Sequence, residues 1–357
     1  MNPSQQAVPM NFDIAERFEQ NPILKSGDIR SSIPGMKVEC LLNPGVFRFA
    51  GRIWLLLRVA ERPEQKPGKT SFPILENGAI KILEFNHDDP RLDRSDSRVV
   101  TFDGTDYLTT LSHLRLISSK DGIHFQEEPS FPLLTGQGQL ETYGIEDCRV
   151  AQFDQSYYLT YTQVSANGVG VGLRSTQNWR EIIQHGMIFP PHNKDCALFE
   201  ERIGGSYFAL HRPSSPELGG NYIWIAESPD LLHWGKHRCI AHSRPGKWDS
   251  SRVGAGGAPI RTSEGWLEIY HGADERNRYC LGALLLDLKE PWKVLARSEK
   301  PIMEPVAKYE RTGFFGNVVF TNGHLVDGDT LTIYYGASDS VICGARFSIS
   351  KMLKTLH

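Results

Sequence analysis

Short apolar segments recur along the whole chain and predict β-strands. Each runs apolar or alternates with polar residues, and breaks at glycine, aspartate or asparagine. Clear examples are Arg52–Val59, Tyr157–Val164, Ser206–His211, Trp266–His271 and Leu331–Tyr335. A sustained amphipathic helical period is missing; Ser348–Leu356 is predicted as a short helix, and Phe12–Phe18 is a second helix candidate. The pattern therefore predicts an all-β fold.

A larger unit repeats five times along the sequence. Each unit has a short apolar strand, a Gly/Asp turn, an aromatic-rich strand and a further strand, and it covers roughly 40 to 80 residues. The units run over residues 43–125, 147–179, 195–234, 258–292 and 317–349. Five such units stacked radially predict a five-bladed β-propeller. Two β-sandwich domains are the alternative, but no Pro/Gly/Ser linker divides the chain.

These units give a single catalytic domain with short additions at each end. The expected division is an N-terminal extension over residues 1–35, the propeller over 36–350 and a C-terminal tail over 351–357. The long insert Pro63–Thr110 in the first unit is polar and proline-rich at its start. We expect it to form an elaborated loop over one face of the domain.

The composition excludes several classes of partner. The 357 residues carry 39 Lys and Arg against 42 Asp and Glu, so the net charge of −3 gives no reason to expect nucleic acid. The apolar run Ile53–Leu57 is too short to span a bilayer, and Met1–Gln20 lacks the apolar core of an export signal. The six cysteines lie far apart, without a zinc-ligand spacing. We therefore expect a cytoplasmic protein that binds neither metal nor membrane.

Polar residues gather at the ends of the apolar strands, where a propeller would bring them to one mouth. These positions are Asn43, Arg58, Glu146-Asp147-Cys148-Arg149, Asn193-Lys194-Asp195, His211-Arg212-Pro213, Ser251-Arg252, Tyr270-His271-Gly272 and Ser338-Asp339. Among them, four basic or potentially basic groups come from three different units, and without a ligand they would repel one another: Lys194, Arg212, Arg252 and His271. A bound anion such as phosphate would offset their charge. The alternative is local pairing with neighbouring carboxylates.

Two details of this polar set stay open on the pattern alone. Adjacent strand residues point to opposite faces, so only one of Glu146 and Asp147 should face the axis, and the pattern does not choose between them. The run Gly254–Pro259 precedes a strand and is interpreted as a close backbone approach that could support the site.

Six segments together resemble glycoside hydrolase family 130, the β-mannoside phosphorylases and related mannosidases. They are Gly144–Arg149, Asn193–Asp195, His211–Pro213, Trp248–Gly256, Gly265–Gly272 and Tyr334–Asp339. The resemblance covers residues 43–349 and implies a five-bladed propeller. It implies that Asp147 is the catalytic aspartate and that the four basic residues above bind phosphate. It also implies a mannosyl subsite, to which we assign Asn43, Arg58, Arg149, Asp195 and Asp339.

The implied reaction is inverting phosphorolysis of a β-mannoside. Phosphate attacks the anomeric carbon and yields α-mannose 1-phosphate, so one catalytic carboxylate and a basic cluster suffice. In the resembled family, the aspartate supplies its proton through a mannose hydroxyl. No cofactor is expected; inorganic phosphate is the co-substrate. Likeness over Trp248–Gly256 and Gly313–Asn317 favours β-1,2-mannobiose or short β-1,2-oligomannan, and β-1,4-mannosides are the alternative linkage.

Two departures from the family pattern keep other functions open. Cys148 stands where proline is common, and Leu198-Phe199-Glu200-Glu201 replaces Leu-Phe-Pro-Glu. We expect Glu200 to add a carboxylate near the site, which keeps a β-mannosidase as an alternative. A propeller that only binds carbohydrate is the non-enzyme alternative. The pattern does not predict the oligomeric state, and a homo-oligomer stays open.

Overall fold

Almost all of the regular structure is β-sheet. The computed structural model describes residues 13–95, 99–214 and 218–356. Its helices are η1 (Ser26–Asp28), α1 (Lys308–Arg311) and α2 (Ile349–Lys354), so the predicted C-terminal helix is confirmed. The helix expected over Phe12–Phe18 is wrong from Asp13 onward, because strand β1 (Glu16–Arg17) pairs there with β26 (Val341–Ser348); Phe12 lies outside the described residues. None of the described helices has the length and apolarity that a membrane crossing requires.

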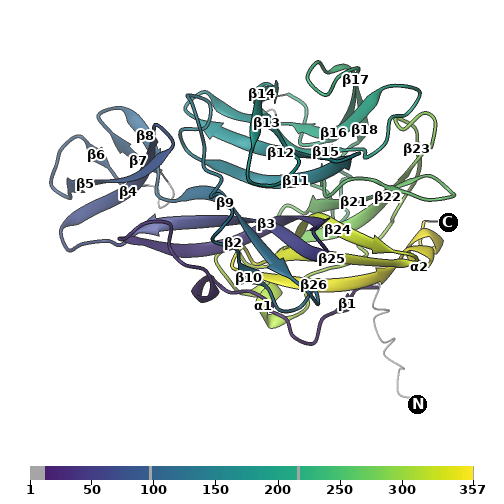
Figure 1. Cartoon of the computed structure of the whole chain (residues 1–357), viewed down its shortest axis with the longest axis horizontal. Coiled ribbons are helices and arrows are strands. Elements are labelled where there is room, and N and C mark those ends of the chain that lie inside the picture. The colour runs from purple at the N-terminus through teal and green to yellow at the C-terminus, as the bar shows by residue number, and fades with distance from the viewer. Residues whose placement is uncertain (1–12, 96–98, 215–217, 357) are drawn as a thin grey trace, which may run out of the picture.

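Five antiparallel sheets follow one another along the chain (Figure 1). The first contains β2 (Met36–Phe49), β3 (Arg52–Pro63), β9 (Leu111–Ser119) and β10 (Gln126–Glu127). The second contains β11 (Ile145–Phe153), β12 (Ser156–Ser165), β13 (Gly168–Thr176) and β14 (Ile183–Phe189). The third contains β15 (Asn193–Leu198), β16 (Tyr207–Pro213), β17 (Ile223–Ser228) and β18 (Gly235–Ala241).

The last two sheets complete this series. Each sheet overlaps one of the five sequence units, although β14, β18, β19 (Arg252–Ala255) and β23 (Val294–Arg297) lie outside the predicted bounds. The fourth contains β19 (Arg252–Ala255), β20 (Ile260–Arg261), β21 (Trp266–Ala273), β22 (Tyr279–Leu286) and β23 (Val294–Arg297). The fifth contains β24 (Val319–Asp327), β25 (Thr330–Ala337), β26 and, from the other end of the chain, β1.

The strands read as continuous apolar runs because both faces of each sheet are covered. In β3, Leu55 and Leu57 pack against the fifth sheet, whereas Leu56 packs against the second sheet. In β22, Leu281 and Leu285 pack against the fifth sheet. An alternating apolar and polar pattern therefore gives way to runs such as Leu55–Leu57, all without exposed surface.

Five apolar clusters fill the spaces between successive sheets. They lie between the first and second, second and third, third and fourth, fourth and fifth, and fifth and first sheets. Each cluster contains large buried side chains from both of its sheets, for example Trp54 and Tyr161 between the first two. The sheets therefore contact one another in cyclic order.

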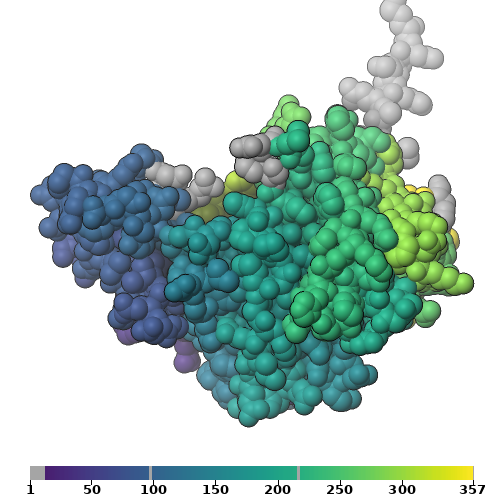
Figure 2. Space-filling view, turned by 90° about the horizontal axis from the view of Figure 1, so that it is seen from above, coloured from purple at the N-terminus to yellow at the C-terminus, as the bar shows by residue number. Residues whose placement is uncertain are grey.

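The insert in the first unit is not the loop that the sequence suggested. It forms two small sheets, β4 (Lys69–Glu76) with β5 (Ala79–Asn86), and β6 (Leu92–Asp93) with β7 (Val99–Phe102) and β8 (Thr105–Leu108). Aromatic contacts join them: the ring centroids of Phe72 and Tyr107 are 4.7 Å apart, and those of Phe85 and Phe102 are 3.8 Å apart. This lobe projects from the side of the five sheets (Figures 1 and 2).

Candidate active site

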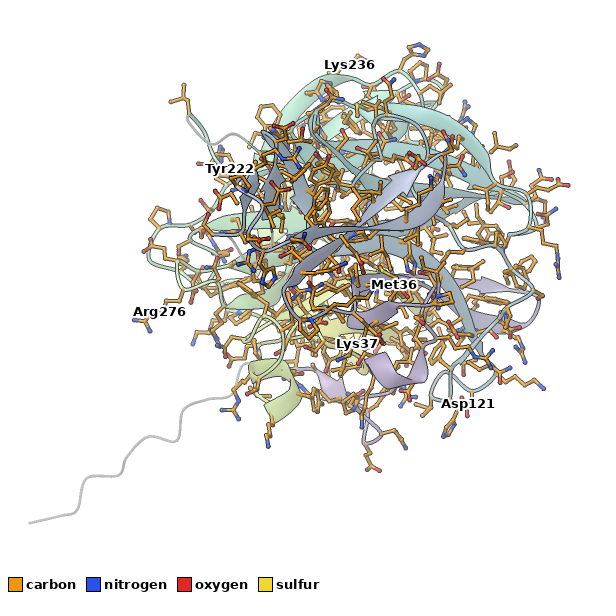
Figure 3. The ribbon with its side chains drawn as sticks, turned by 90° about the vertical axis from the view of Figure 1, so that its left-hand side faces the viewer. Met36, Lys37, Asp121, Tyr222, Lys236 and Arg276 are labelled. Atoms are coloured by element: carbon orange, nitrogen blue, oxygen red, sulfur yellow. The ribbon has the colours of Figure 1, made fainter. Side chains whose placement is uncertain are left out.

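A pocket of about 640 Å³ lies where the ends of strands from all five sheets meet. Its polar lining residues are Asn43, Arg58, Arg62, Thr109, Thr110, Glu146, Asp147, Lys194, Asp195, Arg212, Arg252, Asn277, Tyr279 and Asp339. In Figure 3, Arg276, which precedes the lining residue Asn277 in the sequence, is labelled at the left of the molecule. Charged residues from distant parts of the chain therefore share one cavity.

Irregularities in strand register occur in four sheets, and those in the first three sheets carry residues that line the pocket. The strand register shifts between Leu42 and Gly45, Glu146 and Arg149, Lys194 and Ala197, and Thr321 and His324. Asp147 and Asp195 sit in two of these bulges with positive φ angles of 46° and 53°. Such a conformation is costly for a residue other than glycine, and bulges redirect side chains next to active sites.

The bulge at Asp147 overturns the expectation that only one of two adjacent carboxylates can face the axis. Arg58 donates from Nη1 to Asp147 Oδ1 at 2.9 Å and from Nη2 to Glu146 Oε1 at 2.7 Å. Both carboxylates also line the pocket. Strict alternation fails here because the extra residue of the bulge interrupts the pleat.

Asp147 is ionised in the protein without ligand. Burial opposes its ionisation, but the charges of Arg58 and Arg149 outweigh burial, so the pKa of Asp147 lies below its ordinary value. Asp339 behaves in the opposite way, because burial raises the pKa of its carboxyl to about 6. The positive charge of Arg58 acts on both carboxyl groups, and Asp339 is easier to protonate than Asp147.

Arg149 lies beneath the pocket instead of lining it. Its side chain is 3% exposed, and Nη2 contacts Asp195 Oδ1 at 3.2 Å. Its Nη1 donates to the carbonyl oxygen of Asp147 at 2.9 Å. Local pairing with a neighbouring carboxylate, the alternative raised by the sequence, would join Arg149 to Glu146, but Glu146 binds Arg58 and Arg149 binds Asp195. Arg149 therefore supports the two bulges from below.

Asp195 is the acidic centre of the basic cluster. Arg212 Nη1 lies 3.0 Å from Asp195 Oδ2, and His271 Nε2 lies 3.3 Å from the same oxygen. Burial acts against ionisation of Asp195, but the charges of Arg212 and Arg149 and the contact with His271 outweigh it, so the pKa of Asp195 is held well below its ordinary range. His271 is fully buried and outside the pocket lining, and burial lowers its pKa to about 4, so it is neutral at pH 7.

The other two predicted phosphate ligands have no carboxylate partner. Among the described residues, neither Lys194 nor Arg252 lies within ion-pair distance of an acidic side chain. Arg252 donates instead to Tyr279 Oη at 3.2 Å and to Asn277 Oδ1 at 3.1 Å. Lys194 and Arg252 thus bring uncompensated positive charge to the cavity that also contains Asp147.

Sequence reasoning misplaced one residue and missed others. Glu200 follows the end of β15 that lies opposite the pocket, accepts a hydrogen bond from the backbone N–H of Gln152 at 2.8 Å and does not line the cavity. The expectation that Glu200 adds a carboxylate at the site is therefore wrong. The residues missed as candidates include Arg62, Asn277, Tyr279 and Phe320. The exposed pair Phe314-Phe315, flanked by glycines, was a readable signal for the pocket rim.

The proteins of known sequence to which this chain is similar are β-mannoside phosphorylases. A family model described as β-1,4-mannooligosaccharide phosphorylase matches residues 97–357. The chain is 44% identical over 348 residues to the β-1,2-mannobiose phosphorylase of Listeria innocua, covering 96% of this chain and 98% of that protein. It is 41% identical to a 1,2-β-oligomannan phosphorylase of Thermoanaerobacter, covering 65% and 77%.

A solved structure extends this similarity to the fold. The β-1,2-mannobiose phosphorylase of Listeria innocua, in complex with β-1,2-mannobiose, superposes with a TM-score of 0.89 at 42% identity. The match covers 96% of this chain and 99% of that one.

Proposed function

Since the chain belongs to glycoside hydrolase family 130, we propose that it is an enzyme that cleaves a β-1,2-linked mannoside with inorganic phosphate. The observation that carries this proposal is the pocket itself, in which Lys194, Arg212 and Arg252 surround the same cavity as Asp147. A hydrolase would need a second carboxylate to activate water. Glu200, the candidate for that role, is remote from the cavity, but Glu146, Asp195 and Asp339 also line it. The preference for phosphate over water therefore rests on the three basic residues and not on a lack of carboxylates.

In the proposed reaction phosphate attacks the anomeric carbon of the mannosyl residue from the face opposite the leaving sugar. The bond between that carbon and the bridging oxygen breaks, and the leaving oxygen takes a proton that originates from Asp147 and passes through a mannose hydroxyl. The product is α-mannose 1-phosphate, whose phosphate group gives up its own proton and so restores the acid. Phosphate is the co-substrate, and no further cofactor is needed.

Separate groups of basic residues act on Asp147 and on phosphate, and charge couples the two. Asp147 must gain a proton before it can act as an acid, because Arg58 and Arg149 keep it ionised in the free protein. The negative charge of bound phosphate works against those arginines and raises the proton affinity of Asp147. Lys194, Arg212 and Arg252 hold the phosphate, and His271 acts on it only through its contact with Arg212.

The remaining assignments follow from the pocket geometry. Asn43, Arg58, Asp195 and Asp339 line the cavity beside Asp147 and form the proposed mannosyl subsite, with Arg149 supporting them from below. We further propose that the five sheets are the blades of a five-bladed β-propeller, which the cyclic order of the apolar clusters supports. Retention of a charged sugar phosphate by the cell favours the cytoplasm as the location.

The test is phosphate-dependent release of mannose 1-phosphate from mannobioses of defined linkage. We expect turnover of β-1,2-mannobiose to require phosphate, and ³¹P NMR to detect the α-anomer. Preference for β-1,4-mannobiose would change the linkage but keep phosphorolysis. Release of free mannose without phosphate would establish the hydrolase, and binding of mannoside without any turnover would leave a carbohydrate-binding protein.

A further inference from the structure

The glycine-rich segment after β19 supports the site through its backbone. Arg149 donates from Nη2 to the carbonyl oxygen of Ala255 at 2.9 Å and from Nε to that of Gly256 at 3.0 Å. Its other contacts reach Asp147 and Asp195. The guanidinium therefore stands between the two acidic bulges of the pocket on one side and residues 255–256 on the other.

Gly256 is in turn fixed by a carboxyl group that the proposed mechanism does not use. Its backbone N–H donates to Glu268 Oε1 at 2.8 Å, while β19 ends one residue earlier. A Cβ at position 256 would lie 2.2 Å from the carbonyl oxygen of Ile269, so the close approach requires glycine. Glu268 is 1% exposed, and its Oε2 has no hydrogen-bond partner among the described residues. A buried polar atom of this kind is costly, which is typical of a functional role.

We propose that Glu268 is a positioning residue for the catalytic centre: its carboxyl fixes the Gly256 peptide, on which Arg149 is seated against Asp147. This inference rests on the proposed function, because it treats Asp147 as the acid of that reaction. It assigns the motif Gly254–Gly257 a purpose beyond close packing. The Glu268 side chain itself touches neither the pocket nor the substrate.

The protonation state of Glu268 decides whether this support holds. Burial raises the pKa of Glu268 to about 8, and the Gly256 N–H and the charge of Arg149 only partly oppose that shift. The other groups nearby are uncharged: Leu284 pairs with Glu268 from β22, and burial lowers the pKa of His324, which adjoins Gly257 from β24, to about 4. Glu268 is therefore neutral at pH 7. Above pH 8 it becomes an anion that draws the Arg149 guanidinium away from Asp147.

Two variants separate the role of the acceptor oxygen from that of the charge. Glu268→Ala removes the acceptor for the Gly256 N–H, and Glu268→Gln keeps an acceptor oxygen but cannot ionise. The matched control is Leu284→Ala. It leaves a cavity beside Glu268 but removes none of the hydrogen bonds that join Glu268, Gly256 and Arg149. All are assayed as kcat and KM per folded molecule between pH 6 and pH 9.5.

We expect Glu268→Ala to lower kcat about 10- to 100-fold, because a displacement near 1 Å at the reacting groups costs that much. KM for phosphate should change less than about threefold, since Lys194 and Arg252 do not depend on Gly256. Glu268→Gln should stay within about threefold of wild type at pH 7 and retain its activity at pH 9, where wild type loses it. Leu284→Ala should keep wild-type kcat. Wild-type kcat in Glu268→Ala, or an unchanged alkaline limb in Glu268→Gln, would overturn the proposal.

A double-mutant cycle and crystal structures test whether Glu268 acts through Arg149. In an Arg149→Lys background, Glu268→Ala should cost little further, whereas the same fold-loss as in wild type would exclude action through Arg149. If Glu268→Ala does not fold, the pH comparison with Glu268→Gln still decides. If wild type shows no phosphorolysis, the proposed function fails. Crystal structures of wild type and Glu268→Gln at pH 7 and pH 9 then test the positioning alone: movement of Arg149 only in wild type supports it, and identical positions overturn it.

Discussion

Replacing Arg252 by alanine should weaken phosphate binding and leave the fold almost intact. Arg252 lines the pocket and has no acidic partner among the described residues, so its charge is available to a ligand. Its two hydrogen bonds go to the neutral oxygens of Tyr279 and Asn277. Arg212 differs, because it pairs with the buried Asp195 and its loss would disturb the centre of the site.

The size of the effect follows from these contacts. One charge-assisted hydrogen bond contributes about 1.5–3 kcal/mol, and about 1.4 kcal/mol corresponds to a factor of ten. Arg252→Ala should therefore raise KM for phosphate about 10- to 150-fold, with kcat at saturating phosphate reduced less than about fivefold. Loss of two bonds to neutral, partly exposed groups should lower the free energy of unfolding by only about 1 kcal/mol.

The assay is the initial rate of mannose 1-phosphate formation over a wide range of phosphate concentration, with mannoside saturating. Arg261→Ala is the matched control, because Arg261 is 60% exposed in its side chain and pairs with Glu201 away from the pocket. Chemical denaturation of each variant measures stability. If KM for phosphate stays within twofold of wild type while KM for the mannoside rises, Arg252 belongs to the sugar site and the reasoning fails.

Three further predictions concern neighbouring side chains. Asp147→Asn should lower kcat at least about 1,000-fold while calorimetry still shows phosphate binding, and near-normal kcat would remove its role as the acid. Asp195→Asn leaves Arg149 and Arg212 buried without their anion and should lower the free energy of unfolding by about 3–5 kcal/mol at pH 7. Because the pKa of Asp195 is depressed, its carboxylate stabilises the fold above about pH 4, and this stabilisation is lost in acid. The difference in free energy of unfolding between wild type and Asp195→Asn should therefore shrink from pH 7 to pH 2. A constant difference would contradict this. Phe314→Ala should raise KM for the mannoside a few-fold and leave KM for phosphate unchanged, since Phe314 is an exposed rim residue; the opposite pattern in initial rates would refute it.

Local patterns carry much of the fold. Runs such as Leu55–Leu57 predict strands because apolar sequence is needed wherever a sheet is covered on both faces. The lobe over β4–β8 escaped prediction for two reasons. Strands β6 to β8 have only two to four residues each, and the strands are partly polar and depend on contacts among Phe72, Phe85 and Tyr107. Such contacts lie between separate strands, whereas an analysis of periodicity considers each segment alone.

The site was predictable in its composition and less so in its geometry. Charged residues at strand ends pointed to the pocket, but the left-handed backbone at Asp147 has no glycine to reveal it. Arg149 and His271 were expected to bind ligands directly, yet both lie below the pocket. The position of a residue along a strand does not show whether its side chain reaches the pocket or stays buried beneath it. Glu200 shows the same limit, because it lies two residues beyond Leu198, the end of β15 that is opposite the pocket.

The pairing of β1 with β26 has a consequence for the order of assembly during synthesis. Glu16 lies opposite Arg346, and the backbone N–H of Phe18 donates to the carbonyl oxygen of Gly344, so this segment is synthesised long before its partners. Contacts so distant in sequence form slowly, because a long loop must close first. On the ribosome the β1 segment therefore has no partner until β26 has been synthesised, and β26 presents an open edge until β1 pairs with it.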